Sequence, residues 1–341
     1  MCIRDRFTHD FNDVKTVRLE QNYRSTATIL NAANAVIGNN FGRLGKELWT
    51  DVSDGDPISL YAGFNEYDEA RFIVEQIESW CSQGNERRSA AILYRSNAQS
   101  RVLEESLIRS GTPYRIYGGQ RFYERLEIKN VLAYLRLILN RENDAAVERV
   151  LNTPSRGVGA KTVEFVRAFA RKHDLSLWQS INRTIAEGLL TARAVNAIAG
   201  FVALVDRLDS ETDELPLDEL INHTISASGL MDYHKKEKGE KGQTRIENLD
   251  ELVSAAKQFE QEDEELSPLQ EFLDNAALDA GDTQAEEHED SVQLMTLHSA
   301  KGLEFPLVFL AGIEENLFPH RMSMEEPGRL EEERRLCYVG I

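Results

Sequence analysis

Cysteine, long apolar runs and a leader segment are scarce or missing in this 341-residue sequence, and each absence narrows the class of protein. The three cysteines, at positions 2, 81 and 337, have neither metal-ligand spacing nor an even count, so we expect a reducing, cytoplasmic setting. No apolar run approaches the roughly 20 residues of a membrane span. No apolar segment follows the basic start MCIRDR, which argues against a signal peptide. We therefore expect no membrane partner.

Lysine and arginine are absent from residues 260–290, which hold thirteen carboxylates. Without them the chain balances 39 basic residues against 45 acidic ones (58 minus 13), compared with a net charge of −19 for the whole. Residues 86–130, in contrast, hold nine basic and five acidic residues. We interpret the acidic stretch as a solvated linker or flap, and the basic stretch as a local face open to nucleic acid.

Strand and helix signals alternate from about residue 7 to residue 118. Apolar runs predict strands over 16–19, 58–62, 90–94 and 114–117. Helices are predicted between them over 25–39, 66–81 and 100–109, and Ser25 is the expected N-cap of the first. Such alternation predicts a parallel sheet with helices on its faces.

The pattern becomes helical from about residue 121 to residue 280. Apolar residues recur at helical spacing over 128–140, 145–151, 161–172, 190–208 and 248–260. Strand signals return over 291–312. The predicted fold class is therefore α/β, with one parallel-sheet domain interrupted by an all-α insertion.

A polar loop joins two apolar runs in the segment SVQLMTLHSAKGLEFPLVFL, residues 291–310. The loop carries His298, Lys301, Gly302 and Glu304 between strands that are expected to be buried. Polar loops at strand ends are where α/β proteins hold ligands, although a plain solvated turn is the alternative. The loop is therefore a candidate functional site.

The amino-acid sequence of this segment, TLHSAKGLEFPLVF, closely resembles the fifth conserved motif of UvrD/Rep-type superfamily 1 DNA helicases. LEQNYRS at 19–25 resembles the fourth motif of that family, and EEERRLCYVGI at 331–341 resembles the opening of the sixth. AILYRSNAQSR at 91–101 and YRIYGG at 114–119 are similar to further family segments. Five long segments in the same order, covering the chain from about residue 7 to its end, are far more specific than one short pattern.

The resemblance implies a fold. The α/β part would be the family's second RecA-like motor domain, called 2A, which belongs to the P-loop NTPase superfamily. The all-α insertion would be the family's domain 2B. We accordingly expect domain 2A over residues 7–118 and 286–341, and domain 2B over residues 119–285.

Four residues are expected at a nucleotide. Arginine is permanently cationic and forked, which suits it to the charge that develops on a transferring phosphoryl group. By resemblance, Arg24 is the catalytic arginine that reaches the γ-phosphate of ATP, and Tyr23 stacks on the adenine. Glu304 would accept hydrogen bonds from ribose hydroxyls, and Gly302 lets the backbone approach a ligand closely. For Arg24, a surface ion pair at the start of a helix is the alternative.

Residues at two strand ends are expected to bind DNA. Those after the strand 90–94 offer backbone donors and a stacking platform: Tyr94, Arg95 and Asn97. A tyrosine packed in the core is the alternative at position 94. The resemblance implies that Thr296 and His298 face DNA, and a buried, satisfied histidine is the alternative at 298. Lys301 can contact a phosphate of either ATP or DNA.

A glycine turn in the insertion is a further DNA-binding candidate. Residues 153–162, TPSRGVGAKT, lead into a predicted helix whose first backbone N–H groups can cradle phosphate without reading sequence. Arg156 and Lys161 add positive charge beside Gly157 and Gly159. The resemblance implies that such a turn grips duplex DNA, whereas an ordinary turn between helices is the alternative.

Several motifs that an ATP-driven motor needs are missing. No G-x-x-x-x-G-K-[ST] phosphate loop occurs, and no Asp-Glu pair follows a strand in the way needed to hold Mg²⁺. The expected cofactors are ATP and Mg²⁺, with the ligands of Mg²⁺ outside this chain. The arginine that follows the sixth motif in the family is also missing. We interpret the sequence as a truncated part of a longer protein, with residues 1–6 foreign to it, and expect the chain alone to be inactive.

The function predicted for the whole protein is that of an ATP-dependent 3′–5′ DNA helicase that translocates on single-stranded DNA and unwinds duplex in DNA repair. Its expected partners are single-stranded DNA, single-strand/duplex junctions, the missing N-terminal motor domains and repair proteins. A stand-alone DNA-binding or regulatory module is the alternative, although such a module needs neither Arg24 nor Glu304. A helicase-nuclease subunit is a third interpretation, for which no nuclease domain is visible.

Overall fold

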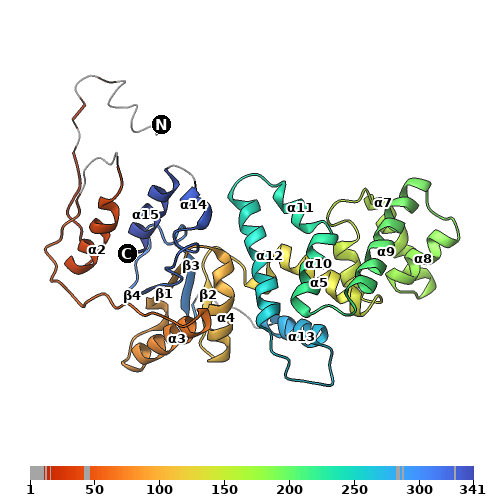
Figure 1. Ribbon diagram of the computed structural model, residues 1–341, viewed down its shortest axis with the longest axis horizontal. Coiled ribbons are helices and arrows are strands. Elements are labelled where there is room, and N and C mark those ends of the chain that lie inside the picture. Colours follow the sequence, from red (N-terminus) through yellow and green to blue (C-terminus); the bar gives the residue numbers. More distant parts are fainter. Residues whose placement is uncertain are drawn as a thin grey trace.

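A four-stranded parallel sheet forms the centre of one of two regions of the molecule (Figure 1). The computed structural model describes residues 11, 14, 15, 17–41, 47–281, 285, 288–325 and 328–341. The strand order is β2-β3-β1-β4, with β1 (Ala90–Tyr94), β2 (Tyr114–Ile116), β3 (Val292–Thr296) and β4 (Leu307–Leu310). In register, Ile92 of β1 lies opposite Leu294 of β3 and Phe309 of β4. Strands from both halves of the sequence therefore build one sheet, which confirms the predicted α/β class.

Helices pack on both faces of this sheet. On one face, α3 (Glu66–Ser82) and α4 (Ser100–Arg109) bury Ile77 and Leu107 with Ile92 of β1. On the other face, α15 (Arg329–Gly340) buries Leu336 with Leu93. The short α14 (Arg321–Glu325) precedes α15, and α2 (Ala27–Gly38) packs against α15. Two of the predicted helices, at 66–81 and 100–109, form almost as expected.

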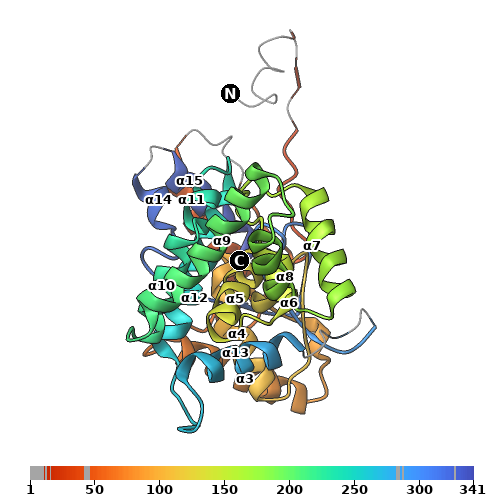
Figure 2. The same ribbon diagram turned by 90° about the vertical axis from the view of Figure 1, so that its right-hand side faces the viewer.

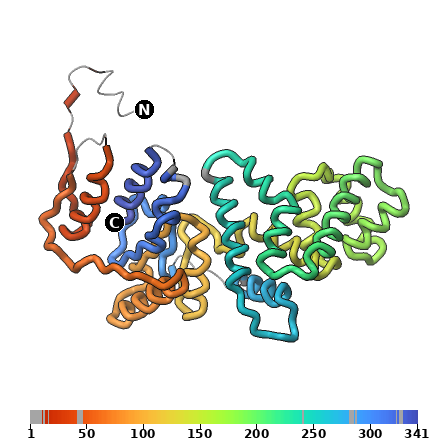
Figure 3. Tube along the Cα trace, viewed as in Figure 1, coloured from red at the N-terminus to blue at the C-terminus, as the bar shows by residue number. Residues whose placement is uncertain are grey.

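Between β2 and β3 the chain leaves the sheet, forms a separate body of helices, and returns (Figure 3). These helices bury one continuous apolar core, which includes Ile128, Ile181, Phe201 and Leu252. In the view along this body, α7, α8 and α9 lie in front (Figure 2). The elements are α5 (Leu126–Leu139), α6 (Asp144–Val150), α7 (Ala160–His173), α8 (Leu177–Ala186), α9 (Ala192–Thr212), α10 (Leu217–Ala227), α11 (Leu230–Lys235), α12 (Glu240–Gln258) and α13 (Pro268–Gly281). The all-α insertion predicted from the 3.6-residue period is confirmed.

Helix α12 fastens the insertion to the α/β region through buried polar contacts. Arg101 of α4 has a side chain only 2% exposed, and it donates to Glu251 at 2.6 Å and to Gln258 at 2.9 Å, both on α12. Arg125, just before α5, donates to the backbone carbonyl of Asn97 at 2.9 Å and to Asn248 Oδ1 at 2.8 Å. A buried charge is costly unless it is paired and hydrogen-bonded, so these contacts hold α12 against α4.

Two predicted strands do not form. Residues 17–19 and 58–62 pair with no strand in the described part of the chain, and Thr16 lies outside it. Near the first segment the structure has an isolated bridge between Gln21 and Trp49. Leu19 and Leu60 are exposed. An apolar run becomes a strand only where another backbone edge and packed side chains meet it, and a local pattern does not contain that information.

The first helix begins later than predicted. Its N-cap is Thr26 rather than Ser25, and α2 starts at Ala27. The reason lies just upstream, where the Asn22 side-chain oxygen accepts the backbone N–H groups of Arg24 and Ser25, each at 2.8 Å. This local turn holds the backbone out of the helix for one residue more.

The acidic stretch is only partly a solvated linker. Its middle forms α13, which buries four apolar residues at helical spacing in the insertion core: Leu269, Phe272, Leu273 and Ala276. Glu271 of this helix is itself buried and accepts the backbone N–H groups of Glu262 and Asp263. The i, i+3, i+4, i+7 pattern of an amphipathic helix was hidden among the carboxylates. No described helix combines the length and the apolarity needed to cross a membrane.

Candidate functional site

The loop after β1 is fixed at the carboxyl edge of the sheet, where ligands of α/β proteins bind. The Gln99 side-chain oxygen accepts the backbone N–H groups of Arg95 and Ser96, each at 2.9 Å, and Ser96 caps the short turn that follows. Gly312, after β4, lies directly against this loop. A Cβ on Gly312 would come within 2.1 Å of Gln99 Nε2, and its φ is +68°. Glycine is therefore required there for the two loops to pack together.

A cavity of about 990 Å³ lies between this edge of the sheet and helix α12. On the sheet side it is lined by Arg95, Asn97, Thr296 and His298. The insertion contributes several residues of α12, including Glu247. The structure thus brings together four of the residues that were predicted to bind DNA, although they come from loops far apart in sequence.

The guanidinium of Arg95 is held in one orientation by Glu333 of α15. Arg95 donates to this carboxylate through Nε at 2.9 Å and through a terminal nitrogen at 2.8 Å. Glu333 also accepts from Ser323 Oγ at 3.0 Å and from the His320 backbone N–H at 3.2 Å. Burial alone would raise the pKa of Glu333, but the hydrogen bonds and charge of Arg95 outweigh it and hold that pKa below its usual value. Arg95 is therefore a paired, oriented donor at the cavity wall.

Arg24 and Glu304 lie next to each other, although 280 positions separate them in the sequence. Arg24 Nε donates to Glu304 Oε2 at 2.6 Å, and the two side chains are 51% and 67% exposed. Tyr23 is also exposed, and its hydroxyl donates to Gln21 Oε1 at 2.8 Å. Gly302 has a φ of +92° and open space where a Cβ would stand. These groups suit the parts of a nucleotide: an arginine for a phosphate, a carboxylate for a ribose and an aromatic ring for a base. The open backbone at Gly302 allows a ligand to approach closely.

Lys301 lies in the same loop, between His298 on the cavity side and Glu304 on the Arg24 side, and it is exposed. For Mg²⁺, no group of three or more His, Cys, Asp or Glu side chains in the described residues is placed to hold a metal ion.

Tyr94 does not fit the DNA-binding role predicted for it. Its side chain is fully buried, with 0% exposure, among the apolar residues between β1 and helices α3 and α4. Burial raises the pKa of Tyr94 because the apolar surroundings disfavour the phenolate. A strand points alternate side chains to opposite faces, and position 94 falls on a face that is covered by helices. The core alternative is therefore the correct one for Tyr94.

In the glycine turn of the insertion, Arg156 holds its own loop together. Its guanidinium donates to the backbone carbonyls of Val150, Pro154 and Ser228 at 2.9–3.2 Å. These bonds direct the side chain inward rather than toward a phosphate, which corrects the contact expected of Arg156.

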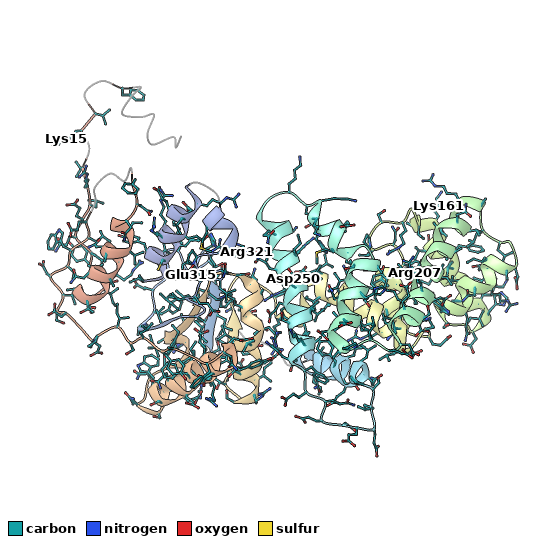
Figure 4. The ribbon with its side chains drawn as sticks, viewed as in Figure 1. Lys15, Lys161, Arg207, Asp250, Glu315 and Arg321 are labelled. Atoms are coloured by element: carbon teal, nitrogen blue, oxygen red, sulfur yellow. The ribbon has the colours of Figure 1, made fainter. Side chains whose placement is uncertain are left out.

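The rest of this turn is open to solvent. Gly157, Gly159 and Lys161 are exposed, and Gly157 has a φ of +80°. Lys161 lies at the end of the insertion away from the sheet (Figure 4). The structure therefore places this turn apart from the cavity, as a separate surface.

Sequence reasoning assigned no individual role to several residues of the cavity. Ser96, Glu247, His320 and Glu333 all line it. A usable signal was present on α12, where polar residues recur at 247, 251 and 258 on the face toward the α/β region. Their partners on other elements follow only from the tertiary fold.

The sequence model of the family described as "UvrD-like helicase C-terminal domain" matches residues 17–341. DNA helicase II of Escherichia coli (strain K12) is 59% identical over 338 residues, covering 98% of this chain and 47% of that relative. DNA helicase II of Haemophilus influenzae (strain ATCC 51907 / DSM 11121 / KW20 / Rd) is 54% identical, with 98% and 46% covered. ATP-dependent DNA helicase PcrA of Bacillus subtilis (strain 168) is 44% identical over 342 residues, again with 98% and 46% covered.

These matches run along almost the whole chain, while the chain spans about half the length of the curated relatives. They agree with the fold, since a parallel sheet interrupted by helices is the arrangement that the family resemblance implied. The chain belongs to the UvrD-like helicase C-terminal domain family.

Proposed function

We propose that this chain is the 2A/2B part of an ATP-dependent 3′–5′ DNA helicase that acts in DNA repair. The observation that carries the proposal is the 2.6 Å pairing of Arg24 with Glu304, which joins the two segments expected to meet a nucleotide. The names of the relatives, DNA helicase II and ATP-dependent DNA helicase PcrA, support the same activity. We further propose domain 2A over 7–118 and 286–341, domain 2B over 119–285, and a cytoplasmic location.

The nucleotide side of the proposal rests on three groups of this chain. ATP, bound with Mg²⁺, would supply the free energy of phosphoryl transfer, and we propose that the ligands of Mg²⁺ lie outside this chain. Arg24 would exchange Glu304 for a terminal phosphoryl oxygen and neutralise the charge that develops there. Glu304, once released, would accept hydrogen bonds from ribose hydroxyls, and the exposed ring of Tyr23 would stack on the base.

The DNA side rests on the cavity between the sheet and α12. Asn97, Thr296 and His298 supply polar groups along one edge, and Arg95 supplies a fixed guanidinium. Lys301 adds an exposed positive charge in the loop that carries His298. Such groups bind the backbone of single-stranded DNA without reading its sequence. Gly157, Gly159 and Lys161, at the far end of the insertion, form a separate surface suited to duplex phosphates at a junction.

A chimera tests this function. The matching segment of DNA helicase II of Escherichia coli is replaced by this chain, and ATP hydrolysis and unwinding of duplexes with 3′ or 5′ tails are measured. We expect DNA-stimulated hydrolysis and unwinding of the 3′-tailed duplex only. A folded chimera that hydrolyses no ATP would contradict the proposal, and DNA binding by such a chimera would favour a stand-alone binding module.

The chain by itself should behave differently. Only half of a nucleotide site between two motor domains is encoded here, and positioning requires both halves. We therefore expect the purified 341-residue chain to hydrolyse no ATP, with or without DNA. DNA-stimulated turnover by the purified chain would overturn that expectation.

A further inference from the structure

A single carboxylate of the insertion reaches across the cavity and holds two loops of the α/β region. Glu247 of α12 accepts a hydrogen bond from Ser96 Oγ at 2.6 Å. Its other oxygen lies 3.2 Å from His320 Nε2 and accepts from Gln243 of its own helix at 3.1 Å. Ser96 follows β1, and His320 lies before α14, so two separate loops converge on one anion.

The two donors are held in place by contacts that do not involve Glu247. Ser96 receives its position from Gln99, which accepts its backbone N–H at 2.9 Å. His320 is held by its backbone N–H, which donates to Glu333 at 3.2 Å. The backbones that carry the hydroxyl and the ring nitrogen are therefore fixed without Glu247, and both groups face its carboxylate. A phosphate oxygen accepts from the same kinds of donor as a carboxylate oxygen does.

The donors at the two ends of the α12 junction differ in their access to solvent. His320 is 19% exposed, whereas Arg101, the partner of Glu251 one turn along α12, is 2% exposed. The two carboxylates, Glu247 and Glu251, are about equally exposed, at 21% and 22%. Partly exposed charge pairs are weak and exchange partners readily, while buried ones do not. The contact at Glu247 is therefore the end of the α12 junction that another anion can replace.

We propose that Ser96 Oγ and His320 Nε2 form a phosphate subsite for the DNA strand, and that Glu247 occupies this subsite as an internal anion until a backbone phosphate displaces it. This inference rests on the proposed function, because it takes the cavity to be the site of single-stranded DNA. Displacement removes the contact of Glu247, while the Arg101–Glu251 and Arg125–Asn248 contacts keep α12 docked. Strand entry thereby removes one of the contacts that attach the insertion.

The test compares binding of a fluorescein-labelled oligothymidylate to the 341-residue chain and to Glu247→Gln at one fixed salt concentration. Glutamine keeps the size of the side chain and removes the competing charge. We expect binding to tighten by about fivefold, the upper range for one partly exposed charge pair. Glu247→Ala should also tighten binding. A carboxylate that merely positioned the loop would give the opposite result, with Glu247→Ala weaker and Glu247→Gln unchanged.

The matched control is Glu332→Gln. Glu332 lines the same cavity, but its carboxylate pairs with Arg335 of its own helix rather than with Ser96 or His320. This variant removes the same charge from the lining of the same cavity, but away from Ser96 and His320, so it should change affinity by less than about twofold. Equal tightening by both variants would show a general charge effect and would overturn the proposal.

The remaining outcomes separate the inference from the function on which it rests. In one outcome the unsubstituted chain binds DNA, and Glu247→Gln binds it with equal or lower affinity. This result would overturn the phosphate subsite and leave the DNA-binding function intact. Absence of binding in both the unsubstituted chain and Glu247→Gln would contradict the proposed DNA site itself, and the inference with it.

Discussion

Two arginine–carboxylate pairs in this chain have the same 2.6 Å separation and opposite surroundings. Arg101 and Glu251 join α4 to α12, and the arginine is 2% exposed. Arg24 and Glu304 join the start of the chain to the loop after β3, and they are 51% and 67% exposed. The first pair shares its arginine with Gln258, Tyr67 and Glu105.

The difference in exposure separates a structural pair from one that a ligand can use. Desolvated charges depend on their partners, so removal of one leaves the other buried and uncompensated. Solvated charges gain little from each other, so either can turn to a ligand at small cost. The same chemistry therefore makes a fixed structural contact at Arg101 and leaves Arg24 free to take up the phosphate-binding role that we propose for it.

The largest effect is expected from Arg24→Ala in the chimera. Loss of an arginine that neutralises charge on the transferring phosphoryl group should lower kcat for ATP hydrolysis by about 10³- to 10⁵-fold. The thermal midpoint should not change, because the pair is solvated. Arg71→Ala is the control, since Arg71 is an exposed arginine paired with acids on its own helix. A kcat within a few-fold of the unsubstituted chimera would remove Arg24 from the catalytic site.

Arg101→Ala should produce the reverse pattern. Glu251 and Glu105 would lose their buried partner, so the free energy of unfolding should fall by about 3–5 kcal/mol. Denaturant unfolding of the chain measures this. Arg88→Ala serves as the control, because Arg88 pairs with Glu86 at the same 2.6 Å but in solvent, and its removal should leave the midpoint unchanged. Equal loss in both variants would contradict the role assigned to burial.

Glu304→Ala sharpens the comparison from the carboxylate side. Loss of the ribose contact should raise KM for ATP in the chimera by about tenfold, as expected for a hydrogen bond to a charged group. The stability of the chain should change by less than about 1 kcal/mol. Glu75→Ala, which removes another exposed partner of an arginine, should alter neither quantity. An unchanged KM would mean that Glu304 does not meet the nucleotide.

The smallest effect concerns pH and the wall of the cavity. His234 of α11 is fully buried, and burial lowers its pKa, although Glu237 at 3.6 Å acts in the opposite sense and Arg245 in the same sense. The folded state therefore binds fewer protons than the unfolded state, in which the pKa is near 6.5. Stability from this group is present above about pH 6.5 and is lost as pH falls through the folded pKa.

His234→Leu should remove this dependence. Unfolding free energies measured from pH 7.5 to pH 5 should fall less steeply for the variant than for the unsubstituted chain. Both ring nitrogens lack a hydrogen-bond partner in the structure, so an apolar replacement breaks no hydrogen bond there. Parallel pH profiles for the two proteins would show that His234 is not the group responsible.

Local patterns predicted the helices and the central strands because those signals are contained in a few consecutive residues. Helices α3 and α4 follow the spacing of their apolar residues, and β1 follows its apolar run. The failed strands at 16–19 and 58–62 have similar runs but lack a partner edge among the described residues. Helix α13 was missed because its apolar face is diluted by carboxylates.

For the candidate site, the motifs can be recognised in the sequence, whereas the contacts between residues of different motifs follow only from the fold. The Arg24–Glu304 contact joins two motifs, and nothing local indicates that they touch. Sequence reasoning predicts DNA contacts for Tyr94 and Arg156. The side chain of Tyr94 is buried in the core, and the guanidinium of Arg156 donates to three backbone carbonyls. Glu247 had no predicted chemistry because its partners, Ser96 and His320, come from distant segments.

The central claim is that the DNA strand enters the cavity between the sheet and α12, while the nucleotide meets the opposite side of the same loop at Arg24. Cross-linking tests it most directly, with an oligothymidylate that carries 4-thiothymidine and with mass-spectrometric mapping of the linked residues. The account predicts cross-links within residues 95–97 and 296–298. Cross-links confined to the Arg24 side or to other surfaces of the chain, with none in those two loops, would contradict it.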